Sequence, residues 1–373
     1  MTKPFAHEKL KKAILQKVKN GELKPGARIL SIGELGKKYG ISAKSVIKAI
    51  EELKAENILS THQGKGTFIA SAEKSAGPSN KTIGVITPDL LISFHTEIVV
   101  AIEKEAFKKG YQVVIGNTDN MVQKEEHYMK EFFRQGLDGA VVVAGKNSIN
   151  NKYFSGFVTK TPVVLVDIAI EGIRTDLVTT DDVSGAYEAI CHLINLGHRK
   201  IALITGPLDV STARQRMKGC KKAFLEYAIP FNQNLIRTTD YNERSGYQAM
   251  LELLNVKDRP TAVFAASDVE ALGVIKAIHS RNLRVPEDIS VVGYGNLKLV
   301  TEIPLTSVLQ PAYEMGTIAF RNLLEKIEGT RSMADIKEVI FPTKLIVRES
   351  SGPCNPDNKT SRTKEAALVY QNR

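Results

Sequence analysis

Residues 58–69 read Ile58-Leu-Ser-Thr-His-Gln-Gly-Lys-Gly-Thr-Phe-Ile69, two short alternating segments around Gln63-Gly64-Lys65-Gly66. This pattern predicts a β-hairpin whose glycines allow positive φ and a close backbone approach, with Lys65 at its tip. When such a basic hairpin directly follows a recognition helix, it is a wing that can reach phosphates or the minor groove. Whether this hairpin is a wing therefore depends on the residues that precede it.

Three helical segments precede the hairpin, and we expect them at about residues 7–19, 31–40 and 42–56. The second begins at Ser31 with Glu34 three residues later, which is the pattern of a capping box. A tight junction with a glycine at the turn separates the second helix from the third. This arrangement predicts a helix-turn-helix.

The third helix divides into an apolar and a basic face. A helical wheel places Val46, Ala49, Ile50 and Leu53 on one side, and Lys44, Ser45, Lys48 and Glu52 on the other. A lysine face alone is also typical of an ordinary solvated helix. The hairpin that follows favours a recognition helix, whose N-terminal residues reach base edges and phosphates.

Positive charge is concentrated in the first seventy residues. They hold 14 Lys and Arg against 6 Glu, a net charge of +8, whereas the whole chain of 373 residues carries +10. A small basic module on a near-neutral body is typical of a nucleic-acid-binding head attached to a second unit.

The composition is that of a globular protein, with 43% hydrophobic and 25% charged residues, and the length suggests two or three domains. We see no apolar run of membrane-spanning length and no signal peptide, and therefore expect a cytoplasmic protein. The three cysteines form no CxxC pair. Cys191-His192 with His198 could be a metal site, but the spacing favours a core thiol and surface histidines. We expect no metal and no cofactor.

The rest of the chain follows a different pattern. Residues 1–70 form the predicted winged-helix domain, and 71–81, rich in Ser, Ala, Gly and Pro, a linker. Over 82–348, short β-branched runs alternate with helical segments, which predicts α/β architecture with two doubly wound parallel-sheet lobes. Residues 349–373 are polar, and we expect a mostly disordered tail.

Ligands of two-lobed α/β proteins bind at the carboxyl ends of the strands, in the cleft between the lobes. The residues just past the predicted strands are Asp89, Asn117, Asp167, the 206–216 loop, Ser267, Asp268, Gly295 and Gln310. Short carboxylates, amides and hydroxyls with an arginine suit a small polyol or sugar. No catalytic motif stands out over 82–348, so we expect no enzyme.

The head resembles the winged helix of GntR-type bacterial regulators. The similarity lies in Leu23-Lys-Pro-Gly-Ala-Arg-Ile-Leu-Ser31, Tyr39-Gly-Ile-Ser42 and Gln63-Gly-Lys-Gly-Thr-Phe68. It implies that DNA is contacted by Arg28, Ser31, Ser42, Lys44, Ser45, Lys48, His62, Gln63, Gly64, Lys65, Gly66 and Thr67. That family usually has arginine where this chain has Gly33, Ala43 and Ile47. Lysine cannot replace the guanidinium fork that pairs with guanine, so the operator should differ.

The body resembles the effector domain of LacI-type repressors, which implies the periplasmic-binding-protein fold. The similarity lies in residues 83–89, 196–208, 213–219, 285–294 and 305–310. It implies that Arg216 holds a ligand hydroxyl or carboxylate, that Asp167, Thr212, Ser267 and Gln310 line the cleft, and that Phe94 stands at its mouth.

One substitution departs from that family. Its Gly-Tyr-Asp-Asn step reads Gly293-Tyr294-Gly295-Asn296 here, and the missing aspartate commonly accepts bonds from sugar hydroxyls. Either Asn296 or Asp268 replaces it, or the effector lacks that hydroxyl pair.

The joined architecture resembles the arabinose-repressor branch of bacterial regulators. It implies a homodimeric repressor of carbohydrate-use genes that binds an inverted repeat in double-stranded DNA and is released by a small sugar or sugar derivative. The alternatives are a sugar sensor that activates or needs a co-repressor, and a solute-binding module. The basic hairpin and the absent signal peptide count against the solute-binding module.

Overall fold

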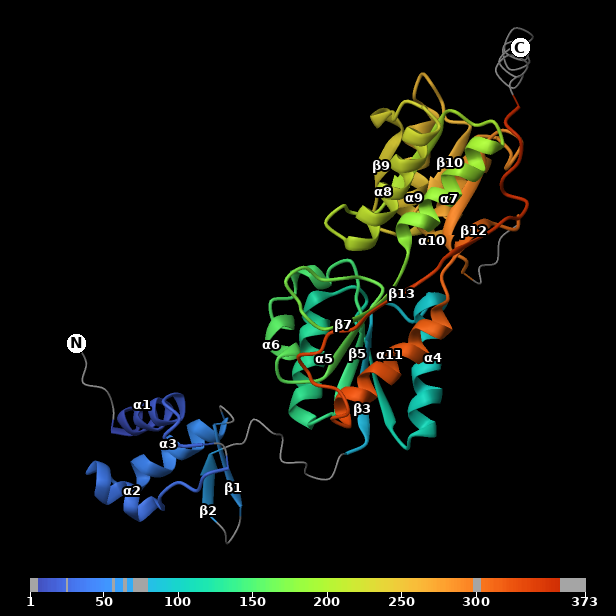
Figure 1. The fold of residues 1–373 in the computed structure, drawn as a ribbon. Helices are drawn as coiled ribbons and strands as arrows, with labels where there is room; N and C mark the ends of the chain where they lie inside the picture. Colours follow the sequence, from blue (N-terminus) through green and yellow to red (C-terminus); the bar gives the residue numbers. More distant parts are fainter. Residues whose placement is uncertain are drawn as a thin grey trace, which may run out of the picture. The chain divides into compact units, whose positions relative to one another are not determined.

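The computed structural model describes residues 6–24, 26–55, 58–62, 66–69, 80–297 and 303–355 (Figure 1). Contacts divide the chain into two compact units, residues 1–79 and residues 80–373. We call them the head and the body. In the described residues, no helix is long and apolar enough to cross a membrane.

The head is a winged helix-turn-helix. Its elements are α1 (Ala6–Lys19), α2 (Ile32–Tyr39), α3 (Ala43–Ala55), β1 (Leu59–His62) and β2 (Gly66–Ile69). The capping box predicted at Ser31 is present, and Gly40 ends α2 at φ 64°, a left-handed conformation that suits glycine. Val46, Ala49, Ile50 and Leu53 are all buried, so the predicted apolar face of α3 is confirmed.

Antiparallel β1 and β2 form the predicted hairpin, with Leu59 opposite Ile69. A third segment extends it, because Ile29 N donates to Thr67 O and Ile69 N donates to Ala27 O. The loop before α2 thus joins the hairpin to the helices.

The first lobe of the body, lobe 1, is a six-stranded sheet in the order β13-β7-β6-β5-β3-β4. All its strand pairs are parallel. Its strands are β3 (Thr82–Thr87), β4 (Gln112–Asn117), β5 (Gly139–Val143), β6 (Val163–Val166), β7 (Asp176–Thr180) and β13 (Glu338–Phe341). Helices α4 (Ser93–Lys108) and α11 (Ala312–Ile327) cover one face, and α5 (Val122–Gln135) and α6 (Phe154–Val158) the other.

The second lobe, lobe 2, has the strand order β14-β12-β11-β10-β8-β9, and only β14 runs antiparallel to its neighbour. Its strands are β8 (Ile201–Thr205), β9 (Ile236–Thr238), β10 (Ala262–Ala265), β11 (Ser290–Gly295), β12 (Thr306–Leu309) and β14 (Lys344–Ile346). Helices α7 (Asp182–Asn195) and α8 (Ser211–Glu226) pack on one face, and α9 (Glu243–Leu254) and α10 (Asp268–Ser280) on the other. The prediction of two doubly wound lobes is confirmed.

The chain passes between the lobes three times. It crosses from β7 to α7, from β12 to α11, and from β13 to β14. Residues at these crossings, such as Asp182 and Gln310, therefore lie where the two lobes meet. This topology places the candidate ligand residues.

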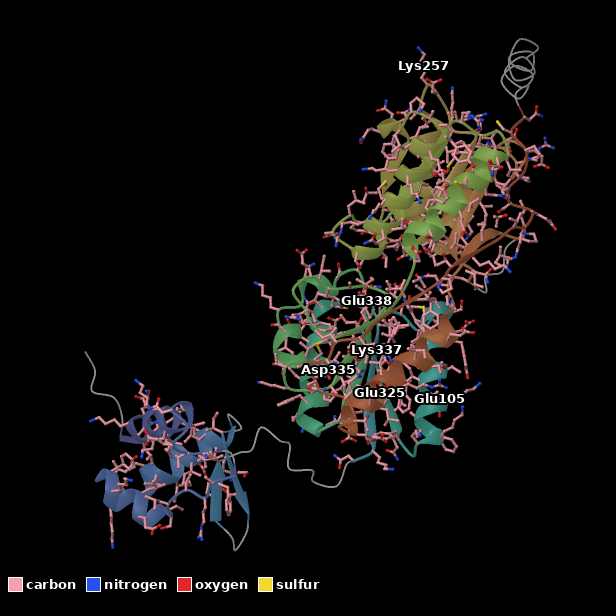
Figure 2. All side chains as sticks on the ribbon, in the orientation of Figure 1. Glu105, Lys257, Glu325, Asp335, Lys337 and Glu338 are labelled. Carbon is pink, nitrogen blue, oxygen red and sulfur yellow. The ribbon has the colours of Figure 1, made fainter. Side chains whose placement is uncertain are left out.

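A buried ion-pair cluster holds the start of β7. Asp176 is fully buried and pairs with Lys326 of α11 at 2.9 Å and with Arg331. Arg331 also pairs with Glu325, and Lys337 N donates to Asp176. Figure 2 labels Glu325 and Lys337 on this part of lobe 1. The cluster fixes the segment between α11 and β13 against the edge of lobe 1.

The prediction of a disordered tail from residue 349 is wrong for residues 349–355. Ser350 is fully buried, its hydroxyl donates to Val291 O, and it accepts a bond from Thr306 N. His198 contacts Ser290 and Gly352 O, and it is a buried side chain, not the surface histidine that we expected. We call residues 349–355 the strap. The remainder, 356–373, and residues 71–79 of the predicted linker lie outside the described residues.

Candidate effector site and nucleic-acid interface

The predicted recognition helix presents lysine to solvent. Lys44 and Lys48 are exposed on α3. Ser42 caps this helix, because its hydroxyl accepts from Ser45 N at 3.2 Å and lies 3.0 Å from Ser45 Oγ. Glu52, which the helical wheel placed on the lysine side, pairs with Lys11 of α1 at 3.5 Å. The acid on that side is therefore neutralised within the head.

The wing is described in part. The side chain of Arg28 lies against Gly66, where a Cβ would stand 2.8 Å from its Nε. Thr67 Oγ1 lies 3.2 Å from Thr61 Oγ1 across the hairpin. Gln63, Gly64, Lys65 and the side chain of His62 lie outside the described residues. Arg28 lies on the segment that pairs with β2, and Thr67 lies on β2. Ser31, in contrast, caps α2.

Arg216, the residue that the resemblance assigns to the ligand, is surrounded by partners from several elements of the body, and we call this group the centre. It is buried on α8, its Nε donates to Asp182 at 2.9 Å, and its Nη1 donates to Ala266 O at 2.6 Å. Its guanidinium carbon lies 3.8 Å from the centre of the Tyr294 ring. This geometry combines a buried ion pair with a cation–π contact.

Gln310 connects this centre to lobe 1. Its amide nitrogen donates to Asp167 at 3.2 Å and to Thr180 at 3.1 Å. Burial raises the pKa of Asp167 to about 6, although the charge of Arg216 opposes this. Asp167 also adopts φ 73°, an uncommon conformation for a residue with a side chain. Asp167, Arg216 and Gln310 thus come together from three distant parts of the chain.

Both residues proposed to replace the missing aspartate already have hydrogen-bond partners within the protein. Asp268 accepts from Ser307 at 2.6 Å and from Leu297 N at 2.7 Å, and Asn296 Oδ1 accepts from Arg348 at 2.6 Å. Gly295 adopts φ 122°, where an aspartate would be strained. The backbone at residue 295 therefore suits glycine, and Asp268 and Asn296 are both held by bonds within the body.

The other predicted residues have mainly local contacts. Asn117 Oδ1 accepts from Leu90 N, and Asp89 accepts from Leu91 N, so both hold the loop before α4. Ser267 caps α10, and Thr212 is buried one turn before Arg216. Phe94 differs from our expectation, because its ring is only 7% exposed and belongs to the core of lobe 1.

Several residues at the centre were missed from the sequence. Asp181 and Asp182 are adjacent, yet Asp181 caps α7 while Asp182 turns inward to Arg216. Tyr294 lies inside a stretch already singled out. Tyr241 packs against the cores of both lobes, and its ring fills the space beside Gly206. Only the position of Asp182 directly after a strand gave a usable signal.

Glu270 is the least expected member of this group. It lies on α10, is fully buried, and accepts a hydrogen bond from Thr239. Burial raises its pKa to about 8, against the opposing charge of Arg216. Among the described residues, no hydrogen-bond partner lies within reach of its Oε2.

Two further hydrogen bonds and an apolar contact connect the lobes. Lys146 of lobe 1 donates to Asp240 of lobe 2 at 2.7 Å. Ala169 N of lobe 1 donates to Ser211 at the start of α8 at 2.9 Å. Val210 and Ala213 join the same apolar cluster as Ile168 and Ile170. The lobes are held together on both sides of Arg216.

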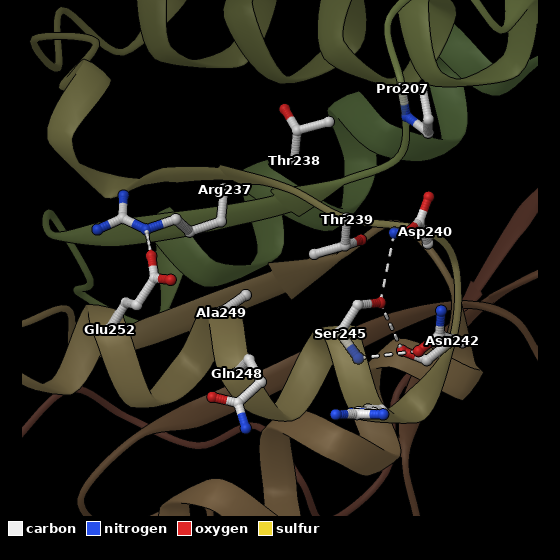
Figure 3. A pocket seen from close by; sticks show the side chains of 11 residues that line it. Pro207, Arg237, Thr238, Thr239, Asp240, Asn242, Ser245, Gln248, Ala249 and Glu252 are labelled. Atoms are coloured by element: carbon white, nitrogen blue, oxygen red, sulfur yellow. Dashed lines mark hydrogen bonds and ion pairs between the residues drawn. The ribbon is translucent and has the colours of Figure 1, made fainter.

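A separate cavity of about 540 Å³ lies between β9 and α9 on lobe 2 (Figure 3). Figure 3 shows Arg237 paired with Glu252 on one side of it, and Ser245 bonded to Asn242 on the other. Of the predicted effector residues, only the 206–216 loop reaches it, through Pro207. We therefore place the candidate effector site at Arg216 and not in this cavity.

Comparisons with known proteins match the head and the body separately. Residues 6–69 match the family profile described as bacterial regulatory proteins, gntR family, and residues 190–351 match that of the periplasmic binding protein-like domain. The HTH-type transcriptional repressor PurR of Erwinia tasmaniensis is 32% identical over 339 residues, which cover 86% of this chain and 96% of that protein.

Solved structures show the same fold. The transcription regulator CcpA of Lactococcus lactis has a TM-score of 0.67 and 28% identity, covering 72% of this chain and 98% of that one. A LacI family transcriptional regulator from Enterococcus faecium with bound ribose has a TM-score of 0.65 and 30% identity, covering 74% and 100%.

Proposed function

The chain belongs to the LacI family of transcriptional repressors, and we propose that a small hydroxyl-rich ligand bound between its lobes releases it from operator DNA. The observation that carries the proposal is the network at Arg216. Through Asp182 and Gln310 it engages two of the three interlobe crossings. A ligand there would interact differently with open and closed lobes, and this difference is what shifts a two-state equilibrium.

The head supplies the affinity for DNA. We propose a GntR-type winged helix, supported by the profile match over residues 6–69. Lys44 and Lys48 of α3 would enter the major groove, while Arg28 and Thr67 of the hairpin meet the neighbouring backbone. The head offers lysines to DNA and lacks the arginines that usually read bases in the GntR family. Phosphate contacts should therefore dominate, and the affinity for DNA should depend steeply on salt concentration.

We propose that the protein acts as a homodimer in the cytoplasm, through an exposed apolar face on lobe 1. This face consists of Val100 and Phe107 on α4 and Ile115 on β4, and Phe107 is 77% exposed. Val100 and Phe107 lie seven residues apart on α4, hence on one side of it, next to the edge strand β4. Exposed apolar side chains on one face are typical of an association site.

The regulated genes would serve carbohydrate use, because the polar groups at the centre suit hydroxyl-bearing ligands. The Enterococcus faecium relative binds ribose, which supports the same ligand class here. No catalytic step is proposed for this site.

The DNA half of the proposal can be tested on the full chain. Operator sequences would be selected from random duplexes, and binding measured by fluorescence anisotropy at several salt concentrations. We expect the double variant Lys44→Ala, Lys48→Ala to bind the operator much more weakly. The salt slope should fall by roughly 0.9 for each phosphate that the variant no longer neutralises.

The matched control is the double variant Lys9→Ala, Lys12→Ala, which removes the same charge from α1. It should retain operator selection. Equally weakened binding in both variants would show that only net charge matters. A selected operator that no sugar or sugar derivative ever weakens would contradict release by ligand.

A further inference from the structure

The charges at the effector centre do not balance, and this limits the ligands that the proposed site can take. Three carboxylates face the centre: Asp182 and Glu270 are fully buried, and Asp167 is half-buried. Arg216 is the one buried cation that the described residues place among them. Lys146 stands nearby, but its ammonium group is paired with Asp240.

Arg216 already has its partners. Its Nε and Nη1 donate to Asp182 and to Ala266 O, and Tyr294 covers its face. These bonds use two of the five N–H donors of the guanidinium. A ligand phosphate or carboxylate on the remaining donors would share the cation with the buried Asp182 carboxylate and be repelled by it. The same anion would also face Asp167 and Glu270.

Glu270 provides a second, independent indication. It is fully buried, one oxygen accepts from Thr239, and Oε2 has no hydrogen-bond partner among the described residues. The charged groups that act on it from neighbouring elements are Arg216, Lys146 and Asp240, and the backbone N–H of Tyr241 donates towards its carboxylate. A buried acceptor without a donor is costly, and a ligand that donates a bond or carries positive charge would remove this cost.

We propose that the effector of this protein carries an ammonium group beside its hydroxyl groups, as an amino sugar does, and that Glu270 selects it over neutral and anionic analogues. The inference rests on the proposed function for the location of the site. Without ligand, bound protons neutralise part of the surplus negative charge, because burial raises the pKa of Glu270 to about 8 and that of Asp167 to about 6. An ammonium ion would replace them, so its binding should release protons.

The first experiment compares matched ligands on the full chain without DNA, near neutral pH. The probes are D-glucosamine, D-galactosamine and D-mannosamine, each beside its neutral hexose, with D-gluconate, D-glucuronate and D-glucose 6-phosphate as anions. Thermal shift and calorimetric titration would measure binding. We expect at least one amine to bind at least tenfold more tightly than its neutral hexose, and no anion to stabilise the protein. Tighter binding of an anion, or no binding by any amine, would overturn the proposal.

The second experiment assigns the selection to Glu270. The Glu270→Gln variant keeps the shape and removes the charge, whereas the control Glu252→Gln removes a carboxylate on α9 that pairs with exposed Arg237. We expect the amine preference and the proton release, measured in buffers of different ionisation enthalpy, to fall in Glu270→Gln only. An unchanged preference in Glu270→Gln overturns the role of Glu270.

Operator binding measured on the same samples separates the two proposals. Release of DNA by an anionic or neutral sugar would leave the repressor function intact and overturn the ammonium inference. Failure of the wild-type chain to select an operator would contradict the proposed function while the ligand preference remained measurable.

Discussion

Glu270 should make the stability of the body depend on pH. Its pKa rises from 4.5 to about 8 on folding, because burial disfavours the charged form. Between these values the folded protein holds a proton that the unfolded chain has released, so stability falls as pH rises, by up to about 1.4 kcal/mol per pH unit. Below the lower value both states are protonated and the effect vanishes.

The Glu270→Gln variant should lack this dependence. We expect urea unfolding curves to show a variant more stable than wild type near pH 8, with the difference shrinking towards acid pH. Asp167, with a pKa of about 6, acts in the same direction at lower pH, so the upper half of the range is the cleaner test. Parallel pH profiles for Glu270→Gln and wild type would contradict the assignment, and Glu252→Gln serves as the control.

The ion pairs of Arg216 and Arg237 should contribute very differently to the free energy of unfolding. Arg216→Ala would strand Asp182 as a buried carboxylate, and we expect a loss of about 3–5 kcal/mol in the free energy of unfolding. Arg237 pairs with a mostly exposed Glu252, so Arg237→Ala should cost less than about 1 kcal/mol. Urea denaturation of both variants measures the contrast. Similar losses would mean that Asp182 finds other partners or water.

The strap contributes to the stability of lobe 2 through one buried serine. Ser350→Ala would leave Thr306 N and Val291 O without their partner, and we expect a loss of about 1–3 kcal/mol. Ser155→Ala, at an exposed position of α6, is the control and should change stability by less than about 0.5 kcal/mol. The two thermal midpoints give the comparison, and a shift for Ser155→Ala as large as that for Ser350→Ala would remove the strap from the explanation.

Elements with strong periodicity were predictable, and those defined by distant partners were not. The continuous apolar run at 139–143 is β5, and the helical period at 312–328 is α11. In contrast β7, Asp176–Thr180, alternates weakly and is a strand because β6 and β13 pair with it. The strap looks like a polar tail in the sequence, and bonds from Ser350, Ser351 and Gly352 to distant segments of the chain hold it in place.

The same reasoning explains which site residues could be found. Arg216 and Gln310 lie in stretches that resemble a known family, so resemblance located them. Glu270 belongs to an ordinary helical sequence, and its importance comes from Thr239, Arg216 and Tyr241 folding over it from other elements. A buried carboxylate and an exposed one look alike in a sequence. Only the assembled lobes show that the centre carries surplus negative charge.

The whole molecule should act on DNA as a dimer, and the apolar face of lobe 1 offers the decisive variant. Phe107 is 77% exposed on α4, and burying it against a second copy would remove its apolar surface from water. Phe107→Glu would place a charge in that contact. We expect a monomeric mass by light scattering, unchanged ligand affinity, and an operator affinity lowered by roughly 100-fold or more, because a monomer engages one half-site instead of two.

The control for this variant makes the same change on the other lobe. Leu225 is 82% exposed at the end of α8, so Leu225→Glu alters surface charge and hydrophobicity by the same amount away from the proposed contact. It should remain dimeric and bind the operator as wild type does. A dimeric Phe107→Glu protein would move the interface away from lobe 1. A monomeric Phe107→Glu protein with full operator affinity would instead separate DNA recognition from dimerisation, because one head would then suffice.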